Sequence, residues 1–118
     1  MISFVIPGKI TSANRVTRRV GNKSLKSESA REDHARIKSL AWVAYGGRDD
    51  LHIVPLKTAV TINAYNSRLD ADNLPKCILD GIKGILIVND SPKHLRQLHV
   101  AHFSDKGDER YEVQVEAL

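Results

Sequence analysis

The sequence has little of several features that would assign it to a class. Its 118 residues include one cysteine, so an internal disulfide is impossible, which fits a reducing compartment. Aromatic residues make up only 5%, which disfavours base stacking on single strands as the main binding mode. No apolar run approaches the length of a membrane-spanning helix, and the apolar start before Pro7 is too short for a secretory signal. We therefore expect a cytoplasmic protein.

Several chemical motifs are also missing. The seven glycines lie singly or as the pair Gly46-Gly47, so there is no glycine-rich loop for a nucleotide phosphate. The five histidines are scattered, and no pair has zinc-ligand spacing with a third partner. Cys77 lies among apolar residues and is most simply a small core residue. Nucleotide-dependent, zinc and thiol chemistry are therefore disfavoured, and no organic cofactor is expected.

The charge is modestly basic, with 18 Lys and Arg against 14 Asp and Glu and a net charge of +4. Such a balance suits a polyanionic partner. Basic residues concentrate in segment 9–26, which is polar and which we expect to be a loop that orders on binding nucleic acid. The alternative is an ordinary solvated loop. The candidates for contacts with a phosphate backbone are Arg15, Arg18, Arg19, Lys23 and Lys26.

The pattern of apolar residues predicts one domain over residues 1–118. Ser29 to Glu32 is a capping box that begins a helix, and Gly46-Gly47 ends it. A second helix is predicted at 73–83, with Asp72 or Asn73 as its N-cap. The predicted strands are 2–6, 56–65, 85–88, 94–103 and 110–116. This order indicates an α/β or α+β fold of two layers, with a mixed sheet and two main helices.

Three carboxylates are predicted to converge in this fold. Asp70 and Asp72 are two residues apart, so in an extended chain they point to the same side. The helix that follows carries the chain away by roughly 16 Å, and an extended segment over residues 85–89 can return it by roughly the same distance if the two run antiparallel. Asp90 then arrives beside the start of the helix. Carboxylate oxygens are the ligands that Mg²⁺ prefers, and a metal held this way supports phosphodiester hydrolysis.

The second predicted helix adds a cation to this group. Lys76 and Asp80 follow Asp72 at helical spacing, so Lys76 is expected to point towards the same pocket and to offset charge on a phosphate. For Asp80 we favour a salt bridge with Lys76 or Lys83 over metal binding. The alternative for the whole motif is that its aspartates only form turns and a helix cap.

At this point the sequence resembles the RusA-type Holliday junction resolvases, which are small bacterial and phage endonucleases. The residues that carry the resemblance are Asp70-x-Asp72-Asn73-Leu74-x-Lys76, then Asp80-Gly81, then Asn89-Asp90-Ser91, together with Pro7 and Asn14-Arg15 near the start. It covers essentially the whole chain and is most specific in segment 68–91. Two departures are Asn89, where the family usually has an acidic residue, and Pro92-Lys93-His94 after Ser91.

The resemblance implies a homodimer that binds four-way DNA junctions and uses Mg²⁺ or Mn²⁺ to introduce paired, symmetric nicks. It implies that Asp70, Asp72 and Asp90 bind the metal and that Lys76 assists catalysis. Asn14 and Arg68 join the basic residues above as expected DNA contacts. Two alternatives stay open: a dimeric module that binds branched DNA without cutting it, and a less selective metal-dependent nuclease that acts on RNA or flaps.

Overall fold

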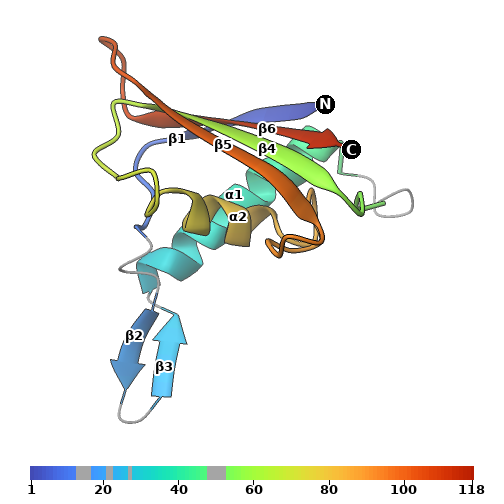
Figure 1. Cartoon of the computed structure of the whole chain (residues 1–118). Helices are drawn as coiled ribbons and strands as arrows, with labels where there is room; N and C mark the ends of the chain where they lie inside the picture. The colour runs from blue at the N-terminus through green and yellow to red at the C-terminus, as the bar shows by residue number, and fades with distance from the viewer. Residues whose placement is uncertain (13–16, 21–22, 27, 48–52) are drawn as a thin grey trace.

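The computed structural model describes residues 1–12, 17–20, 23–26, 28–47 and 53–118. The elements run β1 (Ile2–Pro7), β2 (Thr17–Val20), β3 (Lys23–Lys26), α1 (Glu28–Tyr45), β4 (Thr58–Tyr65), α2 (Pro75–Ile82), β5 (Leu95–Phe103) and β6 (Arg110–Ala117). They form a single small α+β domain in which α1 and α2 lie against one face of a four-stranded sheet (Figure 1). No helix in these ranges is long and apolar enough to cross a membrane.

The main sheet is mixed, as the sequence predicted. Its strand order is β1-β6-β4-β5, and β4 runs parallel to β5 and antiparallel to β6. A parallel pair needs a crossover connection, and here α2 lies within that connection. The segments on either side of α2 therefore carry the two parts of the acidic motif.

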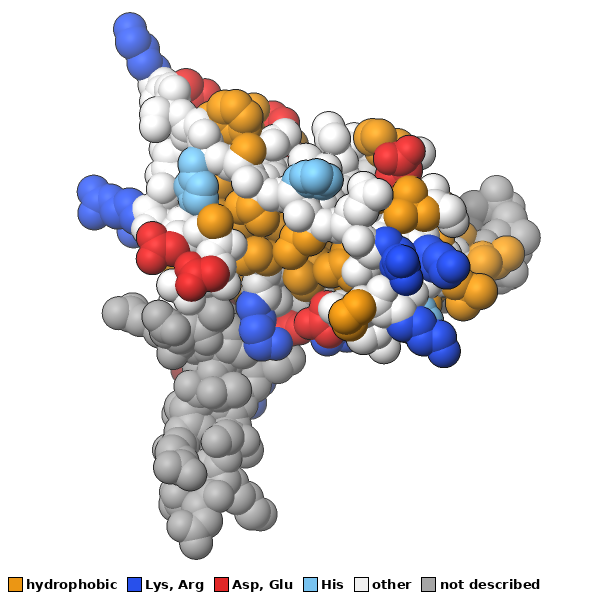
Figure 2. Space-filling model, viewed as in Figure 1, with side chains coloured by type: hydrophobic (Ala, Val, Ile, Leu, Met, Phe, Trp, Pro, Cys, Tyr) orange, Lys and Arg blue, Asp and Glu red, His pale blue; other side chains and the backbone are white. Residues whose placement is uncertain are grey.

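The sheet and the helices share one apolar core. Val60 and Ile62 alternate along β4 with half-buried polar residues, so only one side of the strand is fully covered. The helices also approach closely, because a Cβ at Gly81 of α2 would lie 2.6 Å from a side-chain atom of Ile37 on α1. Figure 2 shows hydrophobic side chains in the centre of this view, with acidic and basic side chains of both signs around them.

Segment 85–88 is not a strand, which corrects the prediction. Gly84 has φ +83°, a conformation that favours glycine, and its N–H donates to the Ile87 carbonyl at 2.7 Å. The only ladder contact within this described segment is an isolated bridge between Lys83 and Ile87. Leu86 and Ile87 are nonetheless buried. A buried turn and a short buried strand have the same apolar sequence pattern, and here the turn is the structure.

Segment 9–26 is also not simply a loop. β2 and β3 pair as an antiparallel two-stranded sheet, with Thr17 opposite Lys26 and Val20 opposite Lys23. In Figure 1 this pair projects away from the main sheet, beyond one end of α1. The prediction of a loop is therefore wrong for these two strands. Asn14 and Arg15 lie outside the described residues.

Candidate active site

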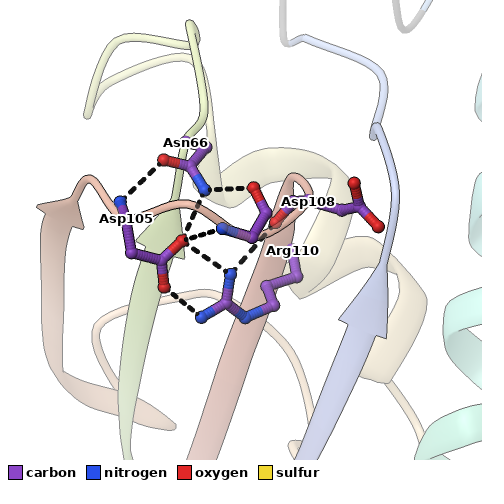
Figure 3. Close-up of polar contacts among 5 residues, drawn as sticks. Asn66, Asp105, Asp108 and Arg110 are labelled. Atoms are coloured by element: carbon purple, nitrogen blue, oxygen red, sulfur yellow. Dashed lines mark hydrogen bonds and ion pairs between the residues drawn. The ribbon is translucent and has the colours of Figure 1, made fainter.

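Hydrogen bonds at the end of β4 hold the chain that leads to Asp70. Asn66 has φ +58°, and its Nδ2 donates to Asp105 Oδ1 and to the Gly107 carbonyl, both at 2.8 Å. The Asp105 N–H returns a hydrogen bond to Asn66 Oδ1 at 2.9 Å (Figure 3). Arg110 Nη2 reaches the same carboxylate at 2.6 Å. The hydrogen bonds from Arg110 and then from Asn66 hold the pKa of Asp105 well below its usual range.

The next residues are fixed by the core of the sheet. Ser67 Oγ lies 2.7 Å from the hydroxyl of Tyr111, whose side chain is fully buried on β6. Burial raises the pKa of Tyr111 to about 12, so the phenol stays neutral. The Leu69 N–H donates to Ser67 Oγ at 3.2 Å, and His102 Nε2 donates to the Leu69 carbonyl at 2.7 Å. Both backbone polar groups of Leu69, the residue before Asp70, therefore have a hydrogen-bond partner.

Asp70 itself begins a turn. The N–H groups of Asn73 and Leu74 both donate to the Asp70 carbonyl at 3.0 Å. The prediction that Asp70 and Asp72 share one side of an extended chain is therefore wrong in its geometry, because residues 71–73 are in a turn. The predicted cap is wrong too. Leu74 occupies the N-cap position of α2, without a side-chain cap. Asp70 and Asp72 are exposed.

Lys76 forms an ion pair within α2. Its Nζ lies 3.2 Å from Asp80 Oδ2, and Lys83 Nζ lies 3.2 Å from Asp80 Oδ1. The predicted salt bridge of Asp80 is confirmed. Burial alone would raise the pKa of Asp80, but hydrogen bonds and charge from both lysines outweigh it and lower that pKa. Asp72 lies in the turn that precedes α2, and Lys76 lies in the first turn of that helix.

Asp90 lies in the segment after α2 and also contacts a lysine. Lys83 Nζ is 3.4 Å from Asp90 Oδ1. The neighbouring Asn89 accepts the Ser91 N–H at 2.9 Å through its side-chain oxygen. This contact explains how Asn89 serves the turn, although it brings no carboxylate to the site.

A cavity of about 580 Å³ opens beside Asp70. Its polar lining includes Arg68 and Asn73 from the motif and Asp33 from α1. Asp33 accepts the Thr11 hydroxyl at 2.6 Å, and Thr11 lines the same cavity. Sequence reasoning missed Asp33, since it belongs to no motif. The available signal was a carboxylate on the apolar side of a helix, three residues after Ala30 and four before Ile37, both of which are buried.

The N-terminal wall of this cavity is held by Arg36. Its guanidinium donates to the carbonyls of Pro7 and Lys9, the latter at 2.6 Å. Lys9 and Ser12 also line the cavity. The chain between β1 and β2 is therefore joined to α1 at the point where it passes Asp70. Positive and negative side chains meet in this cavity, as expected for a site that binds a phosphate beside a cation.

The donors fit a hard divalent cation in their chemistry. Asp70, Asp72 and Asp90 offer exposed carboxylate oxygens, which Mg²⁺ and Mn²⁺ prefer. Asp90 already contacts a cationic group, the ammonium of Lys83. Among the described residues, however, no three His, Cys, Asp or Glu side chains are grouped closely enough to hold a metal. In the described part of the chain, Asp70, Asp72 and Asp90 are therefore not grouped as the sequence predicted.

Comparison with protein-family models identifies the chain. The model of the endodeoxyribonuclease RusA family matches residues 7–116. That range includes β2 and β3, both helices and the whole acidic motif. A search of curated proteins found no match. Since the matched range covers nearly all of the chain, the protein belongs to the RusA endodeoxyribonuclease family.

Proposed function

We propose that the protein is a Mg²⁺-dependent homodimeric endonuclease that resolves four-way DNA junctions by paired, symmetric hydrolysis of phosphodiesters, in DNA recombination and repair. The observation that supports this most is the cavity beside Asp70, lined by Arg68 and Lys9, in a chain of the RusA family. Such an enzyme acts in the cytoplasm, on bacterial or phage DNA.

Asp70, Asp72 and Asp90 are the residues that would hold the metal, and Mn²⁺ is an alternative to Mg²⁺. Once bound, the metal supplies a water of lowered pKa and neutralises charge on the scissile phosphate. Arg68 and Lys9 bind the phosphate in the cavity. Lys76 is half-exposed, and Asp80 fixes its ammonium group. It offsets the negative charge that grows on the phosphate during hydrolysis.

DNA binding is assigned to the basic N-terminal segment as well as to the cavity. β2 and β3 carry Arg18, Arg19, Lys23 and Lys26 in their sequences and project from the body of the domain (Figure 1). A projecting basic arm of this kind suits contacts with phosphates on a neighbouring DNA arm. Asn14 and Arg15, in the same segment, are proposed to join these contacts. A four-way junction has two-fold symmetry, so a dimer would place one site on each of two strands.

The test is cleavage of an end-labelled synthetic four-way junction beside a matched linear duplex, in Mg²⁺ and in EDTA. We expect paired nicks in the junction alone, lost in EDTA. Asp72→Asn should keep junction binding and abolish cleavage, whereas Asp108→Asn, an equal charge change on the β5–β6 turn, should cleave normally. Equal cutting of duplex and junction would contradict junction selectivity. Sedimentation of the free protein tests the dimer.

One observation favours a second candidate, a dimeric module that binds branched DNA without cutting it. The described residues contain no grouped set of three metal-binding side chains. Tight junction binding with no nicks in Mg²⁺ or Mn²⁺ would support this module. Paired nicks would exclude it.

A further inference from the structure

Lys83 connects two carboxylates that differ in their surroundings. Its Nζ lies 3.2 Å from Asp80 Oδ1 and 3.4 Å from Asp90 Oδ1. The Asp80 side chain is 16% exposed, and that of Asp90 is 41% exposed. An ion pair is weaker where water competes for both groups. Lys83 therefore has one sheltered partner and one partner that solvent and solutes reach.

The ion pair between Asp80 and Lys83 is suited to persist when Asp90 changes its partner. It accepts Lys76 as well as Lys83, and His34 Nε2 of α1 lies 3.9 Å from its Oδ2. Its position on α2 is set by helix packing, because the next residue, Gly81, lies directly against Ile37. Asp80 is thus a fixed anion between the two helices.

The segment from Lys83 to Asp90 sets the distance between these partners. Lys83 ends α2 in an extended conformation, with φ −62° and ψ 132°. The turn at Gly84 and the bridge from Lys83 to Ile87 then bring the chain back past the lysine. The contact between Lys83 and Asp90 is a product of this buried turn. The backbone of the turn, and not only the two flexible side chains, therefore sets this contact.

From these contacts we propose that Lys83 is an internal counter-cation that holds Asp90 in the metal-free protein and yields it to the divalent metal, keeping Asp80 as its own partner. The inference rests on the proposed function, because it assumes that Asp90 is a metal ligand. In this structure Asp90, one of the three carboxylates of the proposed site, is held by a cation of the chain itself. Lys83 then acts as a positioning residue that competes with the metal.

The first test is calorimetric titration of Mn²⁺ into the full chain and its variants, without DNA. Lys83→Met should tighten Mn²⁺ binding by about fivefold, or about 1 kcal/mol, the upper value for a partly exposed ion pair. Lys93→Met removes an equal charge from the Asp90 loop, and Lys76→Met removes the other lysine of Asp80. Both controls should change the affinity less. Unchanged or weaker binding in Lys83→Met would overturn the proposal, as would equal tightening in Lys93→Met.

The second test uses thermal unfolding of wild type, Lys83→Met, Asp90→Asn and the double variant. In EDTA the two single changes should be coupled, because they remove the two halves of one contact. In saturating Mg²⁺ the coupling should vanish, since the metal has replaced Lys83. A coupling that is the same in both conditions would overturn the exchange.

These outcomes separate the two proposals. A wild-type protein that binds no Mn²⁺ and cuts no junction defeats the proposed function and the exchange with it. A wild-type protein that binds Mn²⁺ and cuts junctions, with a Lys83→Met variant of unchanged affinity, defeats the exchange alone.

Discussion

The segments that present Asp70 and Asp90 are held by different kinds of contact. Before Asp70, the chain is held by a hydrogen bond between the hydroxyls of Ser67 and Tyr111 and by one from His102 Nε2 to the Leu69 carbonyl. Asp90 is held through its own carboxylate, by a partly exposed ion pair with Lys83. A hydrogen bond to a fully buried side chain such as Tyr111 holds the segment in place, whereas a partly exposed ion pair can exchange with water or ions. Of these two proposed metal ligands, Asp70 is therefore preorganised by its backbone, and Asp90 can change its partner.

This difference suggests how Asp90 can be held in place when no metal is bound. Three converged carboxylates repel one another, and a protein that held all three rigidly would carry that repulsion when no metal is bound. The ion pair with Lys83 offsets the charge of Asp90 in the metal-free protein. In the proposed site, Asp70, Asp72 and Asp90 would hold the metal, whose charge would offset their mutual repulsion.

The largest effect is expected when either proposed metal ligand, Asp70 or Asp90, is replaced. We expect Asp70→Asn and Asp90→Asn each to lower junction cleavage by more than about 100-fold, because even the residues that only support metal ligands can be worth that much. Thermal unfolding in EDTA should separate them. Asp90→Asn should lose stability with its ion pair, and Asp70→Asn should not. Equal destabilisation would remove the difference between the two segments.

The next effect concerns the helix that joins the two segments. Gly81→Ala places a Cβ 2.6 Å from Ile37, so α1 and α2 must separate. We expect a loss of about 1–3 kcal/mol in the free energy of unfolding, as for other overpacked cores. Urea denaturation measures it. Gly84→Ala is a contrasting variant, because space around Gly84 is open and its cost comes from φ +83° instead.

A smaller effect is expected at the buried phenol. Tyr111→Phe keeps the packing and removes the hydroxyl that contacts Ser67, so the free energy of unfolding should fall by about 1 kcal/mol. If the Asp70 segment is preorganised, junction cleavage should fall as well, with Mn²⁺ affinity reduced. A Tyr111→Phe variant that loses stability but retains full metal affinity would mean that the segment keeps its shape without this contact.

Much of the fold follows from patterns that have one physical cause. Alternation at Val60 and Ile62 marks a strand with one covered side, and the structure has β4 there. The apolar run 85–88 has two possible causes, a buried strand or a buried turn, and residue types alone do not separate them. The positive φ of Gly84, +83°, directs the chain into the turn.

The site residues that belong to a sequence motif could be predicted. Those that reach the site only through the packing of the fold could not. Asp70, Asp72, Lys76 and Asp90 were identified from their spacing. Metal binding by the three aspartates and the catalytic role of Lys76 are still predictions. Asp33 reaches the cavity only because α1 packs beside the chain after β1. Lys83 was recognised only as a partner of Asp80. Its contact with Asp90 depends on the shape of a turn whose apolar sequence predicts a strand.

The smallest expected effect is on the free energy of unfolding at acidic pH. The pKa of Asp80 is lowered in the folded protein from its ordinary 3.8, because the two lysines outweigh the effect of burial. A depressed pKa contributes stability that is fully present above the unfolded value and is lost as pH falls through the folded value. Stability should therefore decline below about pH 3.8 by a few tenths to about 1 kcal/mol on account of this group, discounted for its partial exposure.

Asp80→Asn isolates that contribution. The variant should be less stable than wild type at neutral pH and should approach it in acid, because a protonated carboxyl group and the amide that replaces it are both neutral and similar in shape. Asp108→Asn is the matched control, an exposed aspartate that should leave the difference unchanged. If the gap between wild type and Asp80→Asn were the same at pH 7 and pH 3, Asp80 would stabilise the helices by its shape, and Lys83 would lack the fixed anion that lets it release Asp90.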